Sequence, residues 1–393
     1  MLDRRTFVMA AAGGAAWGQV SPSGKINLGV IGSGSRGTFV MTVFQKNPVV
    51  QVAAICDVYE PNLEKALSLA HGAKAYRNYK ALLEDKDIQA VLITTPEHWH
   101  TQMLLDAMAA GKDAYVEKPL CQTPEQGLAL MNAAKQSRSV VQVGMQRRSY
   151  DLYREARSNI LAPGRLGNVR MVRAWWLNNY LHTPMNRKLQ GRLDWDQWQG
   201  PAPHRELDPT RFFNWRFFPE YGGGIVADQG AHVFDGIHML MSAGFPVFVN
   251  AAAGRKHQPA FETPESVTVA AEYPQDFLAV FTINYAAMHY KTRNDQLNQY
   301  DGDRARLDIG REEYSVYDQG AEEIAALHQV SAGGFSKATD EHVNNFLDCI
   351  RTRKMPNAPI PIGFQACLIA QLANMSLESG KRIRWNTDTM KVE

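Results

Sequence analysis

The sequence predicts two domains: a doubly wound α/β domain on a parallel sheet, followed by an α+β domain with a largely antiparallel sheet. Three observations predict this fold class. The chain has 393 residues, more than a single hydrophobic core usually serves. Residues 22–146 alternate apolar strand-like runs with helical patterns, which is typical of a parallel sheet. Residues 147–393 change to aromatic loops, further strands and two long helices, and residues 1–21 differ from both.

The first domain, 22–146, reads as strands separated by helices in strict alternation. The predicted strands are 25–34, 50–57, 88–96, 113–119 and 140–146. The predicted helices are 37–47, 61–72, 100–112 and 123–137. A helix between successive strands is the connection that parallel neighbours require, so the segment is expected to form a parallel sheet with helices on both faces.

The second domain, 147–393, is predicted from short runs rich in Val, Phe, Tyr and Thr, which favour strands. These runs are 168–176, 265–273, 277–286 and 305–310. Two helices are expected at 340–354 and 364–379, separated by a proline-rich connection. The combination indicates a second domain of the α+β type.

The overall composition narrows the class of protein. Hydrophobic residues make up 45% and charged residues 21%, values of a soluble globular protein. Lys and Arg (42) nearly balance Asp and Glu (40), and the basic residues are dispersed, so the sequence argues against a nucleic-acid partner. The 4 cysteines do not form a disulfide framework and include no C-x-x-C pair. Cys56 is expected in a buried strand, while Cys349 and Cys367 could pair.

The N-terminal segment 1–21 has the character of an export signal. Arg4 and Arg5 precede an Ala- and Gly-rich apolar run that ends near Ala16. The run is shorter than the roughly 20 apolar residues that span a bilayer, so no stable membrane span is expected. The twin arginine resembles a Tat signal, which implies a periplasmic or secreted protein. An amphipathic N-terminal segment is the alternative, and the sequence leaves cleavage open.

A glycine-rich loop follows the first predicted strand and opens the first helix. Gly32, Gly34 and Gly37 match G-x-G-x-x-G, the fingerprint of a dinucleotide-binding (Rossmann) domain. The loop also carries Ser35 and Arg36 as candidate cofactor contacts. Asp57 ends the second strand, about 20 residues after the last glycine, where a carboxylate accepts the ribose hydroxyls of NAD and repels a 2′-phosphate. NAD is therefore the predicted cofactor, although Arg36 leaves NADP open.

The loops after the next strands lie at the same edge of the sheet, where such domains bind their ligands. The candidate cofactor contacts there are Thr95, Pro96, His98, Glu117, Lys118 and Gln146. His98 and His100 can also be read as metal ligands, but without a third ligand nearby the structural interpretation is favoured and no metal is predicted. Lys118 is either a surface lysine or a group that hydrogen-bonds a substrate hydroxyl.

A second polar cluster follows three consecutive glycines, 222–224, in the stretch Glu220–His238. Asp228, His232 and Asp235 are spaced four and three residues apart, so on a helix they share one face. One interpretation is a catalytic group beside a glycine turn; the other is a helix N-cap followed by a core histidine. A zinc site that adds His238 is disfavoured, because six residues of helix turn it away from His232.

Taken together, the motifs resemble the glucose-fructose oxidoreductase, inositol dehydrogenase and MocA-like (Gfo/Idh/MocA) oxidoreductases. The resemblance rests on GVIGSGSRG, CDVYEPN, TTPEHWH, VEKPL, GMQRR, GGGIVADQGAHVFD and HVNNFLDCIRTRKMP. In that family the lysine of the E-K-P motif and a D-x-x-x-H pair act at the substrate carbon, which implies catalytic roles for Lys118, Asp228 and His232. Histidine suits a base that takes a hydroxyl proton near neutral pH. The family also implies a homodimer or homotetramer through the C-terminal sheet.

The substrate expected from this resemblance is a sugar, cyclitol or glycoside. Candidate substrate contacts are Arg147, Tyr180, Trp215 and Arg216, with Asp228 and His232. An NAD(P)-dependent oxidoreductase that transfers hydride is the leading hypothesis. The alternative is a glycoside hydrolase of the same family that oxidises its sugar transiently on tightly bound NAD, a reading that the aromatic insert and the export signal favour. A binding protein that keeps NAD as a structural element is a third reading.

Overall fold

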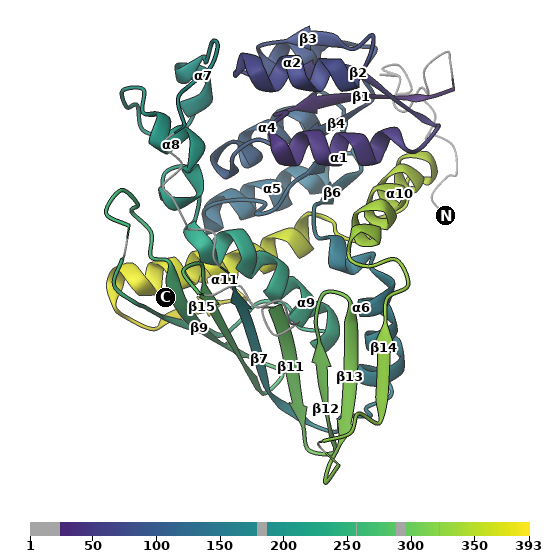
Figure 1. Ribbon diagram of the computed structural model, residues 1–393, viewed down its shortest axis with the longest axis vertical. Helices are drawn as coiled ribbons and strands as arrows, with labels where there is room; N and C mark the ends of the chain where they lie inside the picture. The colour runs from purple at the N-terminus through teal and green to yellow at the C-terminus, as the bar shows by residue number, and fades with distance from the viewer. Residues whose placement is uncertain (1–23, 179–186, 257, 288–295, 322) are drawn as a thin grey trace, which may run out of the picture.

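A parallel sheet forms the first half of the molecule. The computed structural model describes residues 24–178, 187–256, 258–287, 296–321 and 323–393. Within them the first sheet has six strands in the order β3-β2-β1-β4-β5-β6, every neighbouring pair parallel (Figure 1). The strands are β1 (Ile26–Ile31), β2 (Val50–Cys56), β3 (Lys74–Tyr76), β4 (Ala90–Ile93), β5 (Asp113–Val116) and β6 (Val141–Val143). This order is that of a dinucleotide-binding domain and confirms the predicted fold class.

Helices connect the strands of this sheet. They are α1 (Ser35–Gln45), α2 (Glu60–Leu69), α3 (Tyr79–Glu84), α4 (Glu97–Ala109) and α5 (Pro124–Gln136). The sequence did not predict β3 or α3, because a three-residue strand and a six-residue helix are too short to show a periodic pattern. Their local signal is Asn78, whose side chain caps α3 by accepting a hydrogen bond from the Lys80 amide.

A second, larger sheet follows. The described strands form a ten-stranded sheet in the order β14-β13-β12-β11-β7-β10-β9-β8-β15-β16. Among the described pairs, β7–β10 is parallel and the others are antiparallel, so the prediction of a largely antiparallel sheet is confirmed. The strands are β7 (Val169–Leu177), β8 (Phe248–Ala253), β9 (Ser266–Tyr273), β10 (Phe277–Asn284), β11 (Gln296–Gly302), β12 (Ala305–Ile309), β13 (Glu313–Asp318), β14 (Leu327–Val330), β15 (Ile383–Asn386) and β16 (Lys391–Val392).

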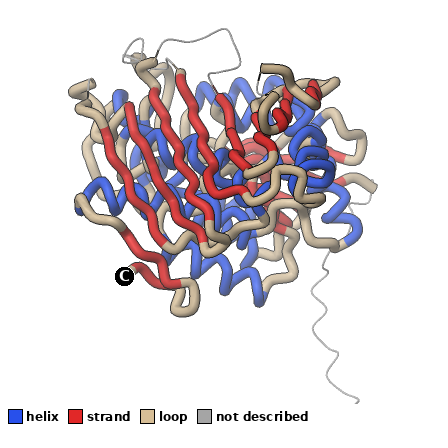
Figure 2. The backbone as a smooth tube through the Cα atoms, turned by 90° about the horizontal axis from the view of Figure 1, so that it is seen from below, coloured by secondary structure: helices blue, strands red, loops and turns tan. Residues whose placement is uncertain are grey.

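Helices lie behind this sheet when it is viewed face-on (Figure 2). The long helices are α9 (Ala231–Met241), α10 (Ser336–Thr352) and α11 (Ile360–Ser379). Short segments complete the domain: η1 (Gln146–Arg148), α6 (Asp151–Ala156), η2 (Arg157–Leu161), α7 (Trp195–Gln199), α8 (Pro209–Phe213), η3 (Trp215–Phe217) and η4 (Val226–Gly230). α9 and α11 share the main core cluster with the inward residues of β9 and β10.

The C-terminal helix α10 packs on the first sheet. Its Phe346 meets the rings of Phe44 and Tyr115 edge-on, with centroids 6.1 and 5.9 Å away. The same core cluster contains apolar residues of β1, β2 and α1. The two halves of the chain therefore share a core, which fixes the second domain relative to the cofactor edge of the first.

The helix α11 is a core element. Among the described helices it is long and apolar enough to cross a membrane by length and composition, with a mean hydropathy of 1.3, but 67% of that window is buried inside the protein. The Cys367 sulfur of α11 lies 3.3 Å from the sulfur of Cys121, whereas Cys349 packs in the other core cluster, so the pairing of Cys349 with Cys367 that the sequence left open is not formed. All four cysteines are free and buried, and Cys56 lies in β2 as predicted.

Candidate cofactor and catalytic site

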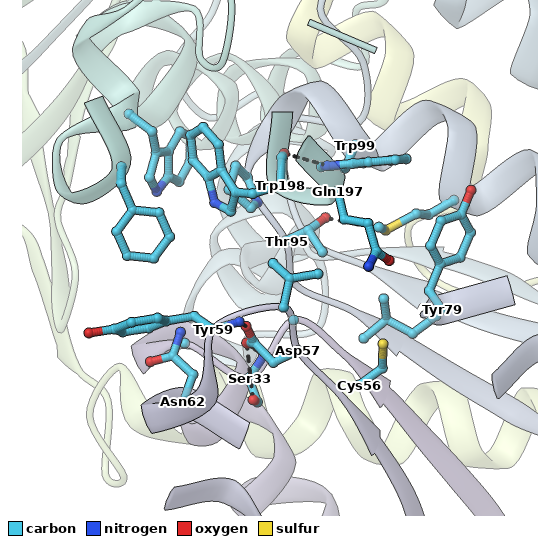
Figure 3. Close-up of a pocket in the computed structure, with 18 of the residues that line it drawn as sticks. Ser33, Cys56, Asp57, Tyr59, Asn62, Tyr79, Thr95, Trp99, Gln197 and Trp198 are labelled. Atoms are coloured by element: carbon cyan, nitrogen blue, oxygen red, sulfur yellow. Dashed lines mark hydrogen bonds between the residues drawn. The ribbon is translucent and has the colours of Figure 1, made fainter. Parts of the chain in front are cut away.

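A cavity of about 880 Å³ opens at the carboxyl ends of β1, β2 and β4. The glycine loop and Asp57 form one wall. The opposite wall comes from α4 and from residues 195–218 of the second domain, which we call the aromatic segment. Gln197, Trp198 and Trp99 therefore lie across the cavity from Asp57 (Figure 3). Its size and position at the strand ends suit a dinucleotide.

Each glycine of the loop meets a separate steric demand. Gly32 has a φ of +83°, and a Cβ there would lie 2.8 Å from Thr95. A Cβ on Gly37 would lie 2.1 Å from the Gly32 carbonyl oxygen, so this glycine lets α1 pack on β1. At Gly34 the nearest atom would be 3.7 Å away, so the backbone there faces open space. These are the turn, packing and ligand-approach positions expected of a pyrophosphate-binding loop.

Asp57 is placed beside this loop at the end of β2. One carboxylate oxygen accepts hydrogen bonds from the amide and hydroxyl of Ser33, at 2.7 and 3.1 Å, and the other accepts from the Tyr59 amide at 2.8 Å. Burial raises the pKa of Asp57, and these donors oppose the shift. The carboxylate lines the cavity next to Ser33 and Ser35, where it can accept ribose hydroxyls.

Arg36 points away from Asp57, toward the ends of β5 and β6. Its guanidinium donates to the Glu117 carboxylate at 2.7 and 2.8 Å. Gln146 donates to the same carboxylate at 3.3 Å. Three of the predicted cofactor contacts therefore form one cluster, and the arginine that left NADP open is already paired with an acid.

The three cofactor contacts predicted after β4 do not all reach the cavity. Thr95 and Pro96 line the cavity, but His98 does not. The Nε2 of His98 lies 2.9 Å from the Trp198 carbonyl, and burial lowers its pKa to about 4, so its neutral ring binds the aromatic segment. His100 bridges the carbonyls of Thr95 and Pro119 at 2.9 and 2.7 Å. Both histidines hold neighbouring loops together.

No cluster of three His, Cys, Asp or Glu side chains arranged to hold a metal ion occurs in the described part of the chain.

Lys118 and Asp228 form a buried ion pair between the domains. The Lys118 Nζ donates to the Asp228 carboxylate at 2.8 Å and also contacts its backbone carbonyl. Three further donors reach this carboxylate: Gln229 at 3.0 Å, Tyr285 at 2.8 Å and Arg216 at 3.4 Å. Burial alone would raise the pKa of Asp228, but Lys118 and Arg216 hold it well below its usual range. Asp228 is therefore an ionised anchor for Lys118.

His232 is the second residue of α9, which continues directly from η4. Asp228 lies in the π-helical turn η4, directly before α9, and such turns recur at functional sites. The ring of His232 has no hydrogen-bond partner among the described residues. Burial, followed by the nearby charges of Lys118 and Arg147, lowers the pKa of His232 well below its usual value. The imidazole is thus neutral at pH 7 and free to accept a proton.

The other predicted substrate residues divide into three groups. Trp215 and Arg216 line the cavity, where the Arg216 guanidinium lies 4.3 Å over the Trp215 ring. Arg147 is buried under α9 and donates to the His232 carbonyl at 3.2 Å. Tyr180 lies outside the described residues.

The remaining polar residues of the Glu220–His238 stretch have structural partners. Asp235 pairs with Arg148 at 2.6 Å, and His238 lies 2.8 Å from the Tyr273 hydroxyl. Both side chains are buried, at 1% and 2% exposure. Of the three polar residues that the sequence placed on one helix face, Asp228 and His232 therefore belong to the site. Asp235 instead forms a buried ion pair with Arg148.

Sequence reasoning missed several groups of this site. Tyr285 follows directly after β10 and reaches Asp228 from the far sheet. Trp198, Gln197 and Phe212 form the outer wall of the cavity. The aromatic segment was noticed for its composition, but its contact with the first domain had no local signal.

Comparison with known proteins agrees with this geometry. The family described as "Oxidoreductase family, NAD-binding Rossmann fold" matches residues 26–145, and its "GFO/IDH/MocA C-terminal domain" matches 153–308. Inositol 2-dehydrogenase of Serratia proteamaculans is 36% identical over 152 residues, 37% of this chain and 44% of that protein. The rhizopine catabolism protein MocA of Rhizobium meliloti is 26% identical over 217 residues, 55% and 57% of the two chains.

A more distant match is a glycosyl hydrolase family 109 protein of a Shewanella species, 33% identical over 123 residues, 28% of this chain and 26% of that protein. The chain spans about half the length, or less, of the curated relatives it matches. Among solved structures, levoglucosan dehydrogenase in complex with NADH and levoglucosan superimposes with a TM-score of 0.74 at 17% identity, covering 92% of this chain and 99% of that one. That likeness concerns the fold.

Proposed function

Because this chain belongs to the Gfo/Idh/MocA family of NAD-binding oxidoreductases, we propose that it oxidises a secondary alcohol of a sugar, cyclitol or glycoside, with NAD as hydride acceptor. One observation carries the proposal: a neutral His232, without a hydrogen-bond partner among the described residues, lies beside the Lys118–Asp228 ion pair. The ion pair adjoins the cofactor cavity, because Arg216 lines the cavity and donates to Asp228.

The chain's own residues divide the work of such a reaction. The hydroxyl that is oxidised must lose its proton as hydride leaves, and His232 is the group able to accept it. Lys118, held in place by Asp228, can donate a hydrogen bond to the oxygen as negative charge develops on it. NAD, held by the glycine loop and Asp57, would supply the hydride acceptor. The polyol substrate class is favoured by relatives named as inositol 2-dehydrogenases.

We also propose that NAD is tightly bound and leaves the site slowly. The Trp198 carbonyl accepts the indole N–H of Trp99 at 2.8 Å and lies 2.9 Å from His98 Nε2. These two contacts hold the aromatic segment over the cavity, and a cofactor enclosed in this way would leave slowly. Asp57 and the engagement of Arg36 by Glu117 support NAD over NADP.

One substitution tests whether the aromatic segment retains NAD. Trp99→Phe removes the indole donor but keeps an aromatic ring, so one of the two contacts to the Trp198 carbonyl is lost. We expect bound NAD to dissociate roughly 2- to 10-fold faster, the value of one hydrogen bond. The measurement is the release rate of copurified cofactor into a scavenging dehydrogenase. A rate equal to wild type would mean that the segment does not retain the cofactor.

A second candidate reaction is hydrolysis of a glycoside through a transient oxidation. Bound NAD would be reduced and regenerated in each cycle, so a retained cofactor favours this reading over a dehydrogenase that exchanges it. The match to a glycosyl hydrolase family 109 protein is consistent with it. The sugar would be oxidised, the aglycone eliminated, water added and the hydride returned.

One experiment separates the two candidates. The purified protein is incubated with nitrophenyl glycosides and with free polyols, with and without added NAD, while nitrophenol and reduced nicotinamide are followed together. Nitrophenol release without net reduction indicates the hydrolase. Sustained reduction that requires added NAD indicates the dehydrogenase. If neither signal appears with any substrate, the proposed function is wrong.

We further propose that two copies meet through the outer face of the ten-stranded sheet. That face presents half-buried Met171, Leu278, Val280 and Leu297. Val280→Lys places a charge in its middle, so we expect a shift toward monomer in light scattering after size exclusion. A wild-type protein that is already monomeric at micromolar concentration would contradict the proposal.

Export by the Tat route is proposed from the twin arginine alone, since residues 1–21 lie outside the described residues. The proposal places the protein in the periplasm or outside the cell. Fractionation of cells that express the full chain, beside a variant with Lys at positions 4 and 5, tests it.

A further inference from the structure

Glu97 is a buried acid that the proposed reaction leaves unused. It is the first residue of α4, directly after Thr95 and Pro96, which line the cofactor cavity, and it is 3% exposed. Its carboxylate accepts a hydrogen bond from the Gly223 amide at 3.0 Å. This contact joins the first domain to the glycine turn that precedes Asp228.

Both backbone polar groups of Gly223 are held by side chains. Asn374 of α11 donates to the Gly223 carbonyl at 3.0 Å, while Glu97 accepts from its amide. A Cβ on Gly223 would lie 2.4 Å from that of Ala227, so the turn packs directly on the segment that carries Asp228. A shift of this turn would therefore be transmitted to Asp228 and to the lysine that Asp228 anchors.

We propose that Glu97 is a positioning residue of the reaction: its carboxylate holds the Gly223 amide and so sets the place of the Lys118–Asp228 pair. The inference rests on the proposed oxidoreductase function. The acid would do this best when ionised, because a carboxylate accepts an N–H bond more strongly than a neutral carboxyl group.

Burial and the surrounding charges together make Glu97 change its protonation state near neutral pH. Asp228 of η4, Lys118 after β5 and Arg216 of η3 act on it, while His98 and His100 of its own helix face other partners. Burial raises the pKa of Glu97 to about 7, Asp228 adds to the shift, and the Gly223 bond and the two cations oppose it. The carboxylate is thus present above about pH 7, and the hold on the turn weakens as the pH falls below it.

The test compares Glu97→Gln with Glu125→Gln, which alters an exposed acid in the first turn of α5. Hydrogen exchange of the holoprotein needs no substrate. We expect Glu97→Gln to exchange the backbone amides of 217–232 faster than wild type at about pH 8, and Glu125→Gln to match wild type. Unchanged exchange in 217–232 overturns the proposal.

Kinetics provide the functional readout. Glutamine mimics the protonated acid, so we expect Glu97→Gln to lose on the order of 10-fold in kcat at about pH 8. We expect wild-type kcat to fall below about pH 7 and this fall to be absent in Glu97→Gln. Asn374→Ala should loosen the same turn yet keep that acid limb. A wild-type pH profile in Glu97→Gln overturns the proposal even if exchange changes.

A replacement variant covers a failure to fold, and the exchange measurement separates failure of this proposal from failure of the proposed function. If Glu97→Gln does not fold, Glu97→Asp replaces it: the shorter acid cannot reach Gly223, and we expect faster exchange and lower kcat, with unchanged values counting against the role. If wild type turns over no polyol or glycoside, the proposed function fails, whereas the exchange difference still supports the hold of Glu97 on the turn.

Discussion

Replacing His232 with alanine is expected to lower kcat on the order of 10²- to 10⁴-fold, the usual contribution of a general base. The imidazole is neutral because burial and the cations Lys118 and Arg147 disfavour its charged form. With no hydrogen-bond partner among the described residues, it is free to take the hydroxyl proton. Alanine leaves no other neutral base at this position, since Asp228 is fully engaged by donors.

The control for this prediction is His238→Ala on the same helix, α9. His238 is buried against the Tyr273 hydroxyl at 2.8 Å, away from the proposed chemistry, so its loss should lower stability and leave kcat nearly unchanged. Both variants should retain NAD, since neither histidine lines the cofactor cavity. A His232→Ala enzyme with kcat within a few-fold of wild type would remove His232 from the mechanism.

The pH dependence gives a second check on His232. Its pKa lies well below the usual value, so the free base persists into mildly acidic solution. Any acid limb of kcat near neutral pH must then come from another group. Glu97, with a pKa of about 7, is the group we expect to see there. The Glu97→Gln profile separates the two contributions.

The cofactor loop was predictable because its demands are local. The tight turn at Gly32 and the close helix contact at Gly37 each exclude a side chain. Both constraints therefore appear as glycines within one short stretch of sequence. The acid that follows the next strand, Asp57, lies at a fixed distance along a chain whose path is set by the fold. Local sterics and the fold together therefore bring half of the predicted cofactor contacts to the cavity lining: Gly32, Gly34, Ser35, Asp57, Thr95 and Pro96.

The walls and anchors of the site were not predictable in the same way. Trp198 covers the cavity because His98 and Trp99 contact its carbonyl, about 100 residues away in the chain, and a single sequence carries no signal for such a contact. His98 resembled a cofactor ligand because it follows Thr95 and Pro96, but its buried ring contacts the Trp198 carbonyl and does not line the cavity. Tyr285 was seen as a strand residue, without a sign that it reaches Asp228.

Strand β11 of the second sheet shows a different limit of prediction from sequence. β11 turns Gln296 and Asn298 into the core, at 4% and 1% exposure, so polar residues occupy the positions that should be apolar. The alternation that marks a half-buried strand is lost there, and β11 escaped prediction. Strands with apolar inward residues, such as β9 and β10, were found.

Replacing Lys118 with methionine should affect both activity and folding. We expect kcat to fall on the order of 10²- to 10³-fold, since the hydrogen bond to the reacting oxygen is lost. The side chains of Lys118 and Asp228 are 12% and 11% exposed, so the substitution leaves a buried carboxylate with weaker compensation. Breaking such a pair costs about 3–5 kcal/mol of unfolding free energy. Urea unfolding of the holoprotein measures this loss.

The loss in Lys118→Met should depend on pH with a definite sign. In wild type the lowered pKa of Asp228 contributes stability that is present above about pH 4 and is lost as the pH falls further. Without the lysine, burial dominates and the Asp228 pKa rises, so the variant should be weakest at neutral pH and approach wild type in acid. The double variant Lys118→Met/Asp228→Asn removes the stranded charge and should regain stability without regaining turnover. If the single variant is as stable as wild type at neutral pH, Arg216, Tyr285 and Gln229 suffice to hold Asp228, and Lys118 is then kept for its chemistry alone.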